Sequence, residues 1–116
     1  MTGPGAVTPL GLNDLTETKA VMLLFGEQAC HSPLSSTKSM TVHMIAATGA
    51  LEAIFCALAI RDSVAPPTIH SQTPDPECDL DDAPNTAREK TVNAAISSAF
   101  GFGGHNAVLA IRRLEG

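Results

Sequence analysis

The stretch that decides the fold is Ser35–Phe55, "SSTKSMTVHMIAATGALEAIF". Its second part is apolar or small, and the apolar run continues to Ile60. Thr41 is a candidate N-cap, so we expect a helix from about Val42 to Ile60. Apolar residues occupy every face of this helix, which predicts that it is enclosed on all sides.

Three ionisable residues, Lys38, His43 and Glu52, lie in this apolar stretch. The simpler interpretation of Lys38 and His43 is that they face water at a helix start. Glu52 lies in the middle of the predicted helix, where a buried carboxylate needs a cationic or hydrogen-bonding partner. The three residues together therefore favour a functional site over a solvated helix start. The same carboxylate would be costly in lipid, so we expect a buried helix of a soluble protein and not a membrane span.

Upstream, the sequence predicts a helix through "ETKAVMLLF", capped by a residue among Asn13, Asp14 and Thr16 and ended at Gly26. Its apolar residues share one face: Leu15, Ala20, Val21, Leu24 and Phe25. Pro33–Ser35 is a candidate brief strand. The segment Gly3–Asp14, "GPGAVTPLGLND", is rich in glycine, proline, asparagine and aspartate and reads as a loop.

Downstream, residues 63–90 hold five of the prolines and read as a long ordered connection, because proline blocks helices and central strands. The runs "NAAISSAF" and "AVLAIRR" then flank "GFGGHN", which predicts a hairpin with glycines at positive φ. As a phosphate cradle the glycine-rich turn is weak, since no GxGxxG or GK[ST] pattern is present. Two interpretations remain open: a plain glycine-rich hairpin turn, or a turn that brings its backbone and the rings of Phe100 and Phe102 close to a ligand.

Composition narrows the class of protein. The 116 residues fit one modest domain, with 44% hydrophobic and 16% charged residues and no Trp or Tyr. Such small side chains bury little area each, so a core built from them is marginal alone and predicts that the chain packs against a partner. The net charge of −5 argues against a nucleic-acid partner. Three cysteines without a CxxC pair fit a reducing, cytoplasmic compartment. We expect no signal peptide in "MTGPGAVTPLG", because it lacks a cationic start and an apolar core.

Histidine and cysteine spacing gives no support for a metal site, because no pair of these residues has helical or CxxC ligand spacing. Cys56 reads as a small core residue within the apolar helix. Cys30 and Cys78 lie in predicted loops without an activating partner, so neither is a good nucleophile candidate.

The order of motifs is more specific than any one of them. "TPLGLNDLTETKAVMLLFGE", "SSTKSMTVHMIAATGALEAIF", "LAIRDSVAPPTI", "PDPECDLD", "AREK" and "SSAFGFGGHNAVLAIRR" follow one another from about Thr8 to Arg113. This series resembles the C-terminal half of the β-ketoacyl-[acyl-carrier-protein] synthases, the elongating condensing enzymes of fatty-acid and polyketide synthesis.

The resemblance implies an α/β chain with a thiolase-like fold, in which a mixed sheet is covered by helices, one of them buried. Residues 1–116 would form a C-terminal synthase-like domain without the N-terminal half that holds the cysteine nucleophile. That cysteine takes an acyl group from the phosphopantetheine arm of acyl carrier protein, so no separate cofactor is implied. The implied partners are acyl carrier protein and a complementary synthase half or homodimer partner, with no nucleic acid and no membrane.

The resemblance also assigns residues. His43 matches the second catalytic histidine, Lys38 the lysine that supports the site electrostatically, and Glu52 the buried acid near that lysine. Phe100 matches the phenylalanine that gates the acyl pocket, and its glycine-rich loop consists of Gly101, Phe102, Gly103 and Gly104.

Departures from the family pattern lie beside these matches. Pro4 stands where the first catalytic histidine is expected, Val42 replaces the glycine before His43, and His105 replaces the usual threonine of the glycine-rich loop. Near Gly11–Asn13 the chain also has two more residues than the family pattern.

Three functional hypotheses follow. The first is part of a 3-oxoacyl-[acyl-carrier-protein] synthase that condenses acyl and malonyl thioesters with loss of CO₂ and needs a complementary chain. The second is a non-catalytic subunit that binds acyl groups or carrier protein, and the third is an inactive truncated remnant. We expect the chain alone to be inactive.

Overall fold

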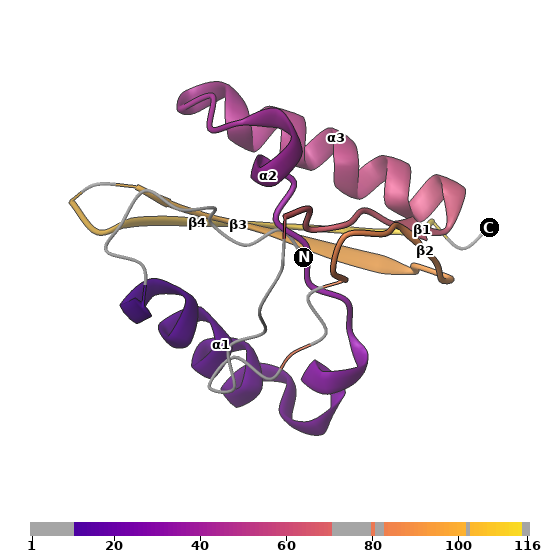
Figure 1. The fold of residues 1–116 in the computed structure, drawn as a ribbon, viewed down its shortest axis with the longest axis horizontal. Helices are drawn as coiled ribbons and strands as arrows, with labels where there is room; N and C mark the ends of the chain where they lie inside the picture. Colours follow the sequence, from indigo (N-terminus) through magenta and orange to yellow (C-terminus); the bar gives the residue numbers. More distant parts are fainter. Residues whose placement is uncertain (1–10, 71–79, 81–82, 102, 115–116) are drawn as a thin grey trace.

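The computed structural model describes residues 11–70, 80, 83–101 and 103–114. Helices come first and strands last, and Figure 1 shows the β3–β4 hairpin across the middle, with α2 and α3 on one side and α1 on the other. This confirms the predicted mixed α/β class. The elements are α1 (Gly11–Phe25), the 3₁₀ helix η1 (Gly26–His31), α2 (Lys38–Thr41), α3 (Ala46–Asp62), β1 (Val64–Ala65), β2 (Arg88–Glu89), β3 (Ala94–Gly101) and β4 (His105–Arg112).

The long apolar helix, α3, begins later than predicted. It starts at Ala46 and not at Val42, and Thr41 is the last residue of α2 instead of an N-cap. The reason is backbone conformation, since Val42 and Ile45 have φ values of 58° and 50°, which no right-handed helix contains. α3 ends where Ser63 adopts a left-handed conformation.

The predicted enclosure of this helix on all sides is wrong for the described part of the chain. Only one stripe of α3 is buried, formed by residues four apart: Thr48, Glu52, Cys56 and Ile60. A spacing of four keeps side chains on one helix face, and this face packs on the hairpin. Cys56 and Ile60 form a small core with Ala95. Ile54, on another face, is exposed.

The hairpin confirms the prediction from the two apolar runs. β3 and β4 pair antiparallel from Ala94 opposite Arg112 to Gly101 opposite His105. Gly103 and Gly104 have φ values of 81° and 80°, so the turn uses the freedom that glycine alone provides at low cost. β3 has buried residues on the α3 side, whereas β4 is exposed along most of its length.

The remaining elements refine the other predictions. α1 begins at Gly11, so the predicted loop up to Asp14 and the caps from Asn13 onward are wrong. It ends at Phe25 and Gly26 has φ 55°, which confirms the predicted stop. The apolar face of α1 is only partly buried, because Val21 is buried and Leu24 is exposed. Ser35 forms a single β-bridge and not a strand. In the connection, β1 pairs with β2, and Thr68 bridges to Pro84.

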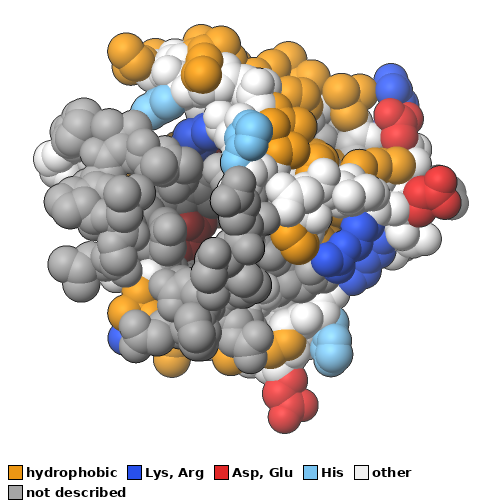
Figure 2. Space-filling view, viewed as in Figure 1, with side chains coloured by type: hydrophobic (Ala, Val, Ile, Leu, Met, Phe, Trp, Pro, Cys, Tyr) orange, Lys and Arg blue, Asp and Glu red, His pale blue; other side chains and the backbone are white. Residues whose placement is uncertain are grey.

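Exposed apolar side chains predict self-association. Figure 2 shows hydrophobic side chains gathered along the side of the molecule that holds α3. Among the described residues the exposed apolar side chains include Ile54 of α3 and Ile45 just before it, and in β4 Val108 and Leu109 are exposed as well. We expect sedimentation velocity to show concentration-dependent association, reduced several-fold by Ile54→Glu. A monomer at all concentrations with a sharp melt would contradict this.

The two described cysteines should differ in reactivity. Cys30 is exposed, whereas Cys56 is buried. Burial raises the pKa of the Cys56 thiol, and the Glu52 carboxylate acts in the same direction. At pH 8 a smaller fraction of Cys56 is therefore thiolate in the folded chain than in the unfolded chain. Because Cys56 is also buried, iodoacetamide should modify it more than about tenfold more slowly than Cys30. Peptide mass spectrometry measures both rates, and urea should equalise them; equal rates in the folded chain would show that Cys56 is accessible.

Candidate functional site

A buried ion pair ties three elements together. Lys38 is the first residue of α2, Glu52 lies in α3, and Ser97 lies in β3. The Lys38 ammonium donates to Glu52 Oε1, and Ser97 Oγ donates to Glu52 Oε2 at 3.1 Å. The Lys38 and Glu52 side chains are 11% and 2% exposed. Both oxygens of the buried carboxylate are thus bonded, which confirms that Glu52 has a cationic partner.

His43 lies in the segment between α2 and α3, and its ring is held by hydrogen bonds. The Ile45 N–H donates to His43 Nδ1 at 3.2 Å, and Thr48 Oγ1 lies 3.0 Å from the same nitrogen. A ring nitrogen that accepts a backbone N–H does not carry a proton itself. The neutral His43 ring therefore has its proton on Nε2, which makes Nε2–H a donor.

The backbone on both sides of His43 is strained. Val42 has φ 58° and ψ 171°, and Ile45 has φ 50° and ψ −118°. These regions belong almost entirely to glycine, and both residues are β-branched. The two residues are 72% and 81% exposed, so burial does not compensate the strain. Val42 therefore replaces the glycine of the family pattern at a position whose backbone conformation suits glycine.

Phe100 and the glycine-rich turn lie at the end of β3. Phe100 is exposed and pairs with Asn106, and Gly101 pairs with His105. The His105 ring lies beside Gly103, because a Cβ built there would be 3.7 Å from His105 Cδ2. Phe102, like Pro4, lies outside the described residues.

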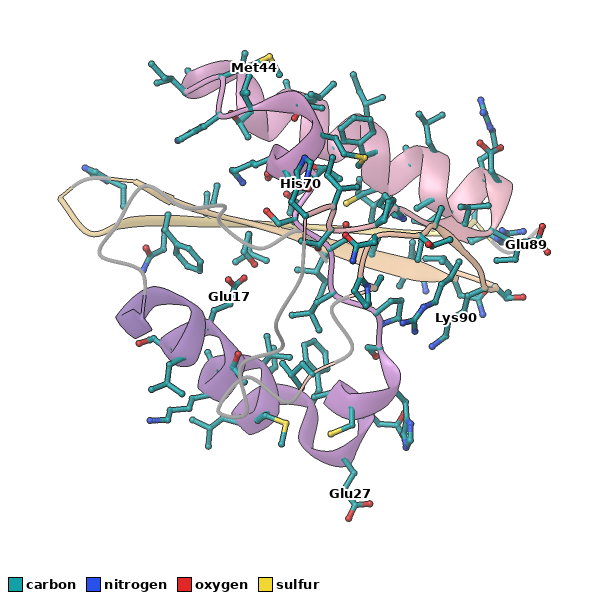
Figure 3. The ribbon with its side chains drawn as sticks, in the orientation of Figure 1. Glu17, Glu27, Met44, His70, Glu89 and Lys90 are labelled. Atoms are coloured by element: carbon teal, nitrogen blue, oxygen red, sulfur yellow. The ribbon has the colours of Figure 1, made fainter. Side chains whose placement is uncertain are left out.

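The His43 segment and the Phe100 turn lie toward the same end of the α3–hairpin unit. Ile60, late in α3, packs with Ala95 at the start of β3, and Glu52 bonds Ser97 further along that strand. α3 and β3 therefore run in opposite directions, and the start of α3 approaches the end of β3. Figure 3 shows Met44 at this end of α3 and Lys90 at the other.

A pocket of about 320 Å³ lies at the other end of α3. Its walls come from Phe55, Cys56 and Ala59 of α3 and from the start of β3. Ser35 also lines it, with a buried hydroxyl that has no hydrogen-bond partner among the described residues. His43, Lys38 and Phe100 do not line this pocket, so it is not part of the candidate site.

Two further properties concern the described residues. No three of their His, Cys, Asp or Glu side chains come close enough together to bind a metal ion. Within the same ranges, every helix is too short or too polar to cross a membrane.

Comparison with known proteins identifies the family. The sequence profile of the beta-ketoacyl synthase C-terminal domain matches residues 5–72, more than half of the chain. The chain belongs to the β-ketoacyl synthase family. It is 56% identical over 111 residues to 3-oxoacyl-[acyl-carrier-protein] synthase 2 of Staphylococcus aureus strain COL, covering 96% of this chain and 26% of that relative. The corresponding synthase of Synechocystis is 45% identical over 111 residues. The chain spans about a quarter of the length of these curated relatives.

Solved structures confirm the thiolase-like fold class. A ketosynthase of a type II polyketide synthase, in complex with its acyl-carrier protein and bound to the hexaketide, superposes with a TM-score of 0.89 at 37% identity. That match covers 97% of this chain and 27% of the ketosynthase. A β-ketoacyl synthase from Burkholderia phymatum superposes with a TM-score of 0.80 at 34% identity, covering 90% of this chain and 25% of the synthase.

Two residues that organise the site were not predicted from the sequence, Thr48 and Ser97. Thr48 lies four residues before Glu52, so the spacing that defines a helix face could have placed it beside the other two groups. Ser97 is the polar residue on the buried side of β3, two residues from Ala95, a signal that alternation along a strand provides.

Proposed function

We propose that this chain provides the histidine-bearing part of a 3-oxoacyl-[acyl-carrier-protein] synthase, which joins an acyl and a malonyl thioester with loss of CO₂. One observation carries the proposal. The Lys38–Glu52–Ser97 linkage ties α2, α3 and β3 together around the His43 segment, at the end of the molecule that also bears Phe100.

In this proposal the Nε2–H of His43 donates to the carbonyl oxygen of the malonyl thioester. When the bond to the carboxylate breaks and CO₂ leaves, its electron pair forms an enolate, and the negative charge develops on that oxygen. The enolate carbon then attacks the acyl thioester on the cysteine nucleophile, the new C–C bond forms, and the C–S bond breaks to release thiolate. The cysteine would belong to the N-terminal part of a synthase.

The other matched residues receive supporting roles. The Lys38 ammonium is mostly buried and bonded to Glu52, so we assign it a positioning role that holds α2, and thus the His43 segment, in place. Phe100 and the turn at Gly101, Gly103 and Gly104 would form a wall of the acyl pocket, because an exposed ring and open backbone at a strand end can approach a ligand closely.

The proposed partners are acyl carrier protein and a complementary synthase part, within the cytoplasm. The ketosynthase solved with its acyl-carrier protein supports the first partner by analogy. The exposed Ile54 side chain of α3 and the neighbouring Ile45 support the second, because exposed apolar residues that gather on one surface mark interaction sites.

The test is decarboxylation of malonyl-carrier protein by this chain in complex with a cysteine-bearing synthase part. His43→Ala should lower the rate by about 10²–10³-fold, the usual effect of removing a donor to a developing oxyanion. His31→Ala, at an exposed histidine of η1, is the matched control and should keep the rate. Equal rates for His43→Ala and the parent chain would refute the proposal.

A second candidate function is carrier-protein binding without catalysis. The exposed apolar side chains of Ile54 in α3 and of Val108 and Leu109 in β4 favour it, because such side chains can bind a partner irrespective of turnover. A carrier-protein complex that forms readily but shows no decarboxylation or condensation would support this alternative over the first.

A further inference from the structure

We propose that Thr48 is a positioning residue that fixes the tautomer and orientation of the His43 ring. This inference rests on the proposed function of His43, but the contact itself does not. Thr48 Oγ1 lies 3.0 Å from His43 Nδ1, and the Met44 N–H donates to the same hydroxyl at 2.9 Å. Nothing in the family resemblance assigns a role to this side chain.

The direction of the hydrogen bonds follows from what each group can donate. A threonine hydroxyl has one proton and two lone pairs. The Met44 N–H uses a lone pair of the hydroxyl, so the hydroxyl proton is available to His43 Nδ1. The Ile45 N–H donates to the same Nδ1. Two donors thus converge on Nδ1, which must present its lone pair and leave the ring proton on Nε2.

Thr48 itself is held in place by burial. It is 5% exposed and lies on the buried stripe of α3, one turn before Glu52. The neighbours Val42 and Ile45 are exposed and strained, so packing of their side chains does not hold the segment. The Thr48 hydroxyl therefore links the His43 segment to the buried face of α3 through two hydrogen bonds, one with His43 Nδ1 and one from the Met44 N–H.

Nitrogen NMR of the complete chain with labelled histidines tests the inference. His43→Gln assigns the His43 signals among the four histidines. We expect the Nε2–H tautomer to dominate in the parent chain and in Thr48→Ser. Thr48→Val keeps the shape of the side chain but loses the hydroxyl. In this variant the ratio of the Nε2–H to the Nδ1–H tautomer of His43 should fall about three- to tenfold, the factor for one ordinary hydrogen bond. The other histidines should not change.

An unchanged His43 tautomer ratio in folded Thr48→Val would overturn the inference. If the amide spectrum shows that this variant does not fold, Thr48→Ala removes the same hydroxyl without branched bulk and is measured in the same way. In the complex with a synthase part, Thr48→Val should lower kcat for decarboxylation with little change in KM, and Thr48→Ser should restore it.

The two proposals fail in different ways. If His43→Ala keeps full activity, the proposed function is wrong, and the tautomer ratio still decides whether Thr48 positions the ring. If His43→Ala abolishes activity but Thr48→Val changes neither the tautomer ratio nor kcat, the proposed function stands and the role of Thr48 is refuted.

Discussion

Replacing Lys38 with methionine is expected to lower the free energy of unfolding by about 3–5 kcal/mol. The substitution leaves the Glu52 carboxylate buried without its cation, bonded to Ser97 Oγ through one oxygen. A small domain is stable by only about 5–15 kcal/mol, so the loss removes a large share of the total. Urea unfolding followed by circular dichroism measures the change.

Two controls separate the ion pair from a general effect of the substitution. Lys19→Met removes an exposed lysine from α1 and should change stability by no more than about 0.5 kcal/mol. The double variant Lys38→Met with Glu52→Met removes both charges and should recover most of the loss, because an apolar pair of similar volume avoids desolvation. If Lys38→Met unfolds at the same urea concentration as the parent chain, the buried pair does not hold α2 to α3.

Val42→Gly is expected to have the opposite effect and to stabilise the chain by about 1–2 kcal/mol. At φ 58° and ψ 171° a valine backbone stores about 1–3 kcal/mol of strain, whereas glycine adopts this conformation freely and loses about 0.5–1 kcal/mol of entropy. The Val42 side chain is exposed, so its removal sacrifices little burial. Thermal or urea unfolding measures the gain.

Val108→Gly is the matched control, because it makes the same chemical change at another exposed valine. Val108 is 65% exposed and lies in the regular strand β4, where glycine weakens the strand. This variant should be destabilised by about 0.5–1 kcal/mol. Destabilisation of both variants would mean that the backbone around His43 does not adopt the strained conformation described above.

The sequence predicted those features that depend on local chemistry. Gly26 ends α1, and Gly103 and Gly104 form the hairpin turn, because glycine adopts positive φ without the steric cost that a Cβ imposes. The partner of Glu52 could be predicted as well, since a buried carboxylate requires a donor and Lys38 is the cation that the resemblance places beside it.

Two kinds of feature could not be predicted in this way: backbone strain imposed by the tertiary structure, and which faces of a helix other elements cover. The apolar run and the candidate N-cap Thr41 favoured a helix start at Val42, but the chain leaves helical geometry there and re-enters it at Ala46. All-round apolarity shows that α3 is suited to enclosure, yet within the described residues the hairpin covers only the stripe that contains Thr48 and Ile60. The contact between Thr48 and His43 exists only because of the non-helical segment between them.

Condensing activity as a function of the ratio between this chain and a cysteine-bearing synthase part tests the central claim most directly. With acyl- and malonyl-carrier protein as substrates, our account predicts no 3-oxoacyl product from this chain alone. Product formation should rise as the second part is added and level off at an equimolar ratio, and His43→Ala should remove it. Condensation by the isolated 116-residue chain would contradict the account, as would activity that does not depend on His43.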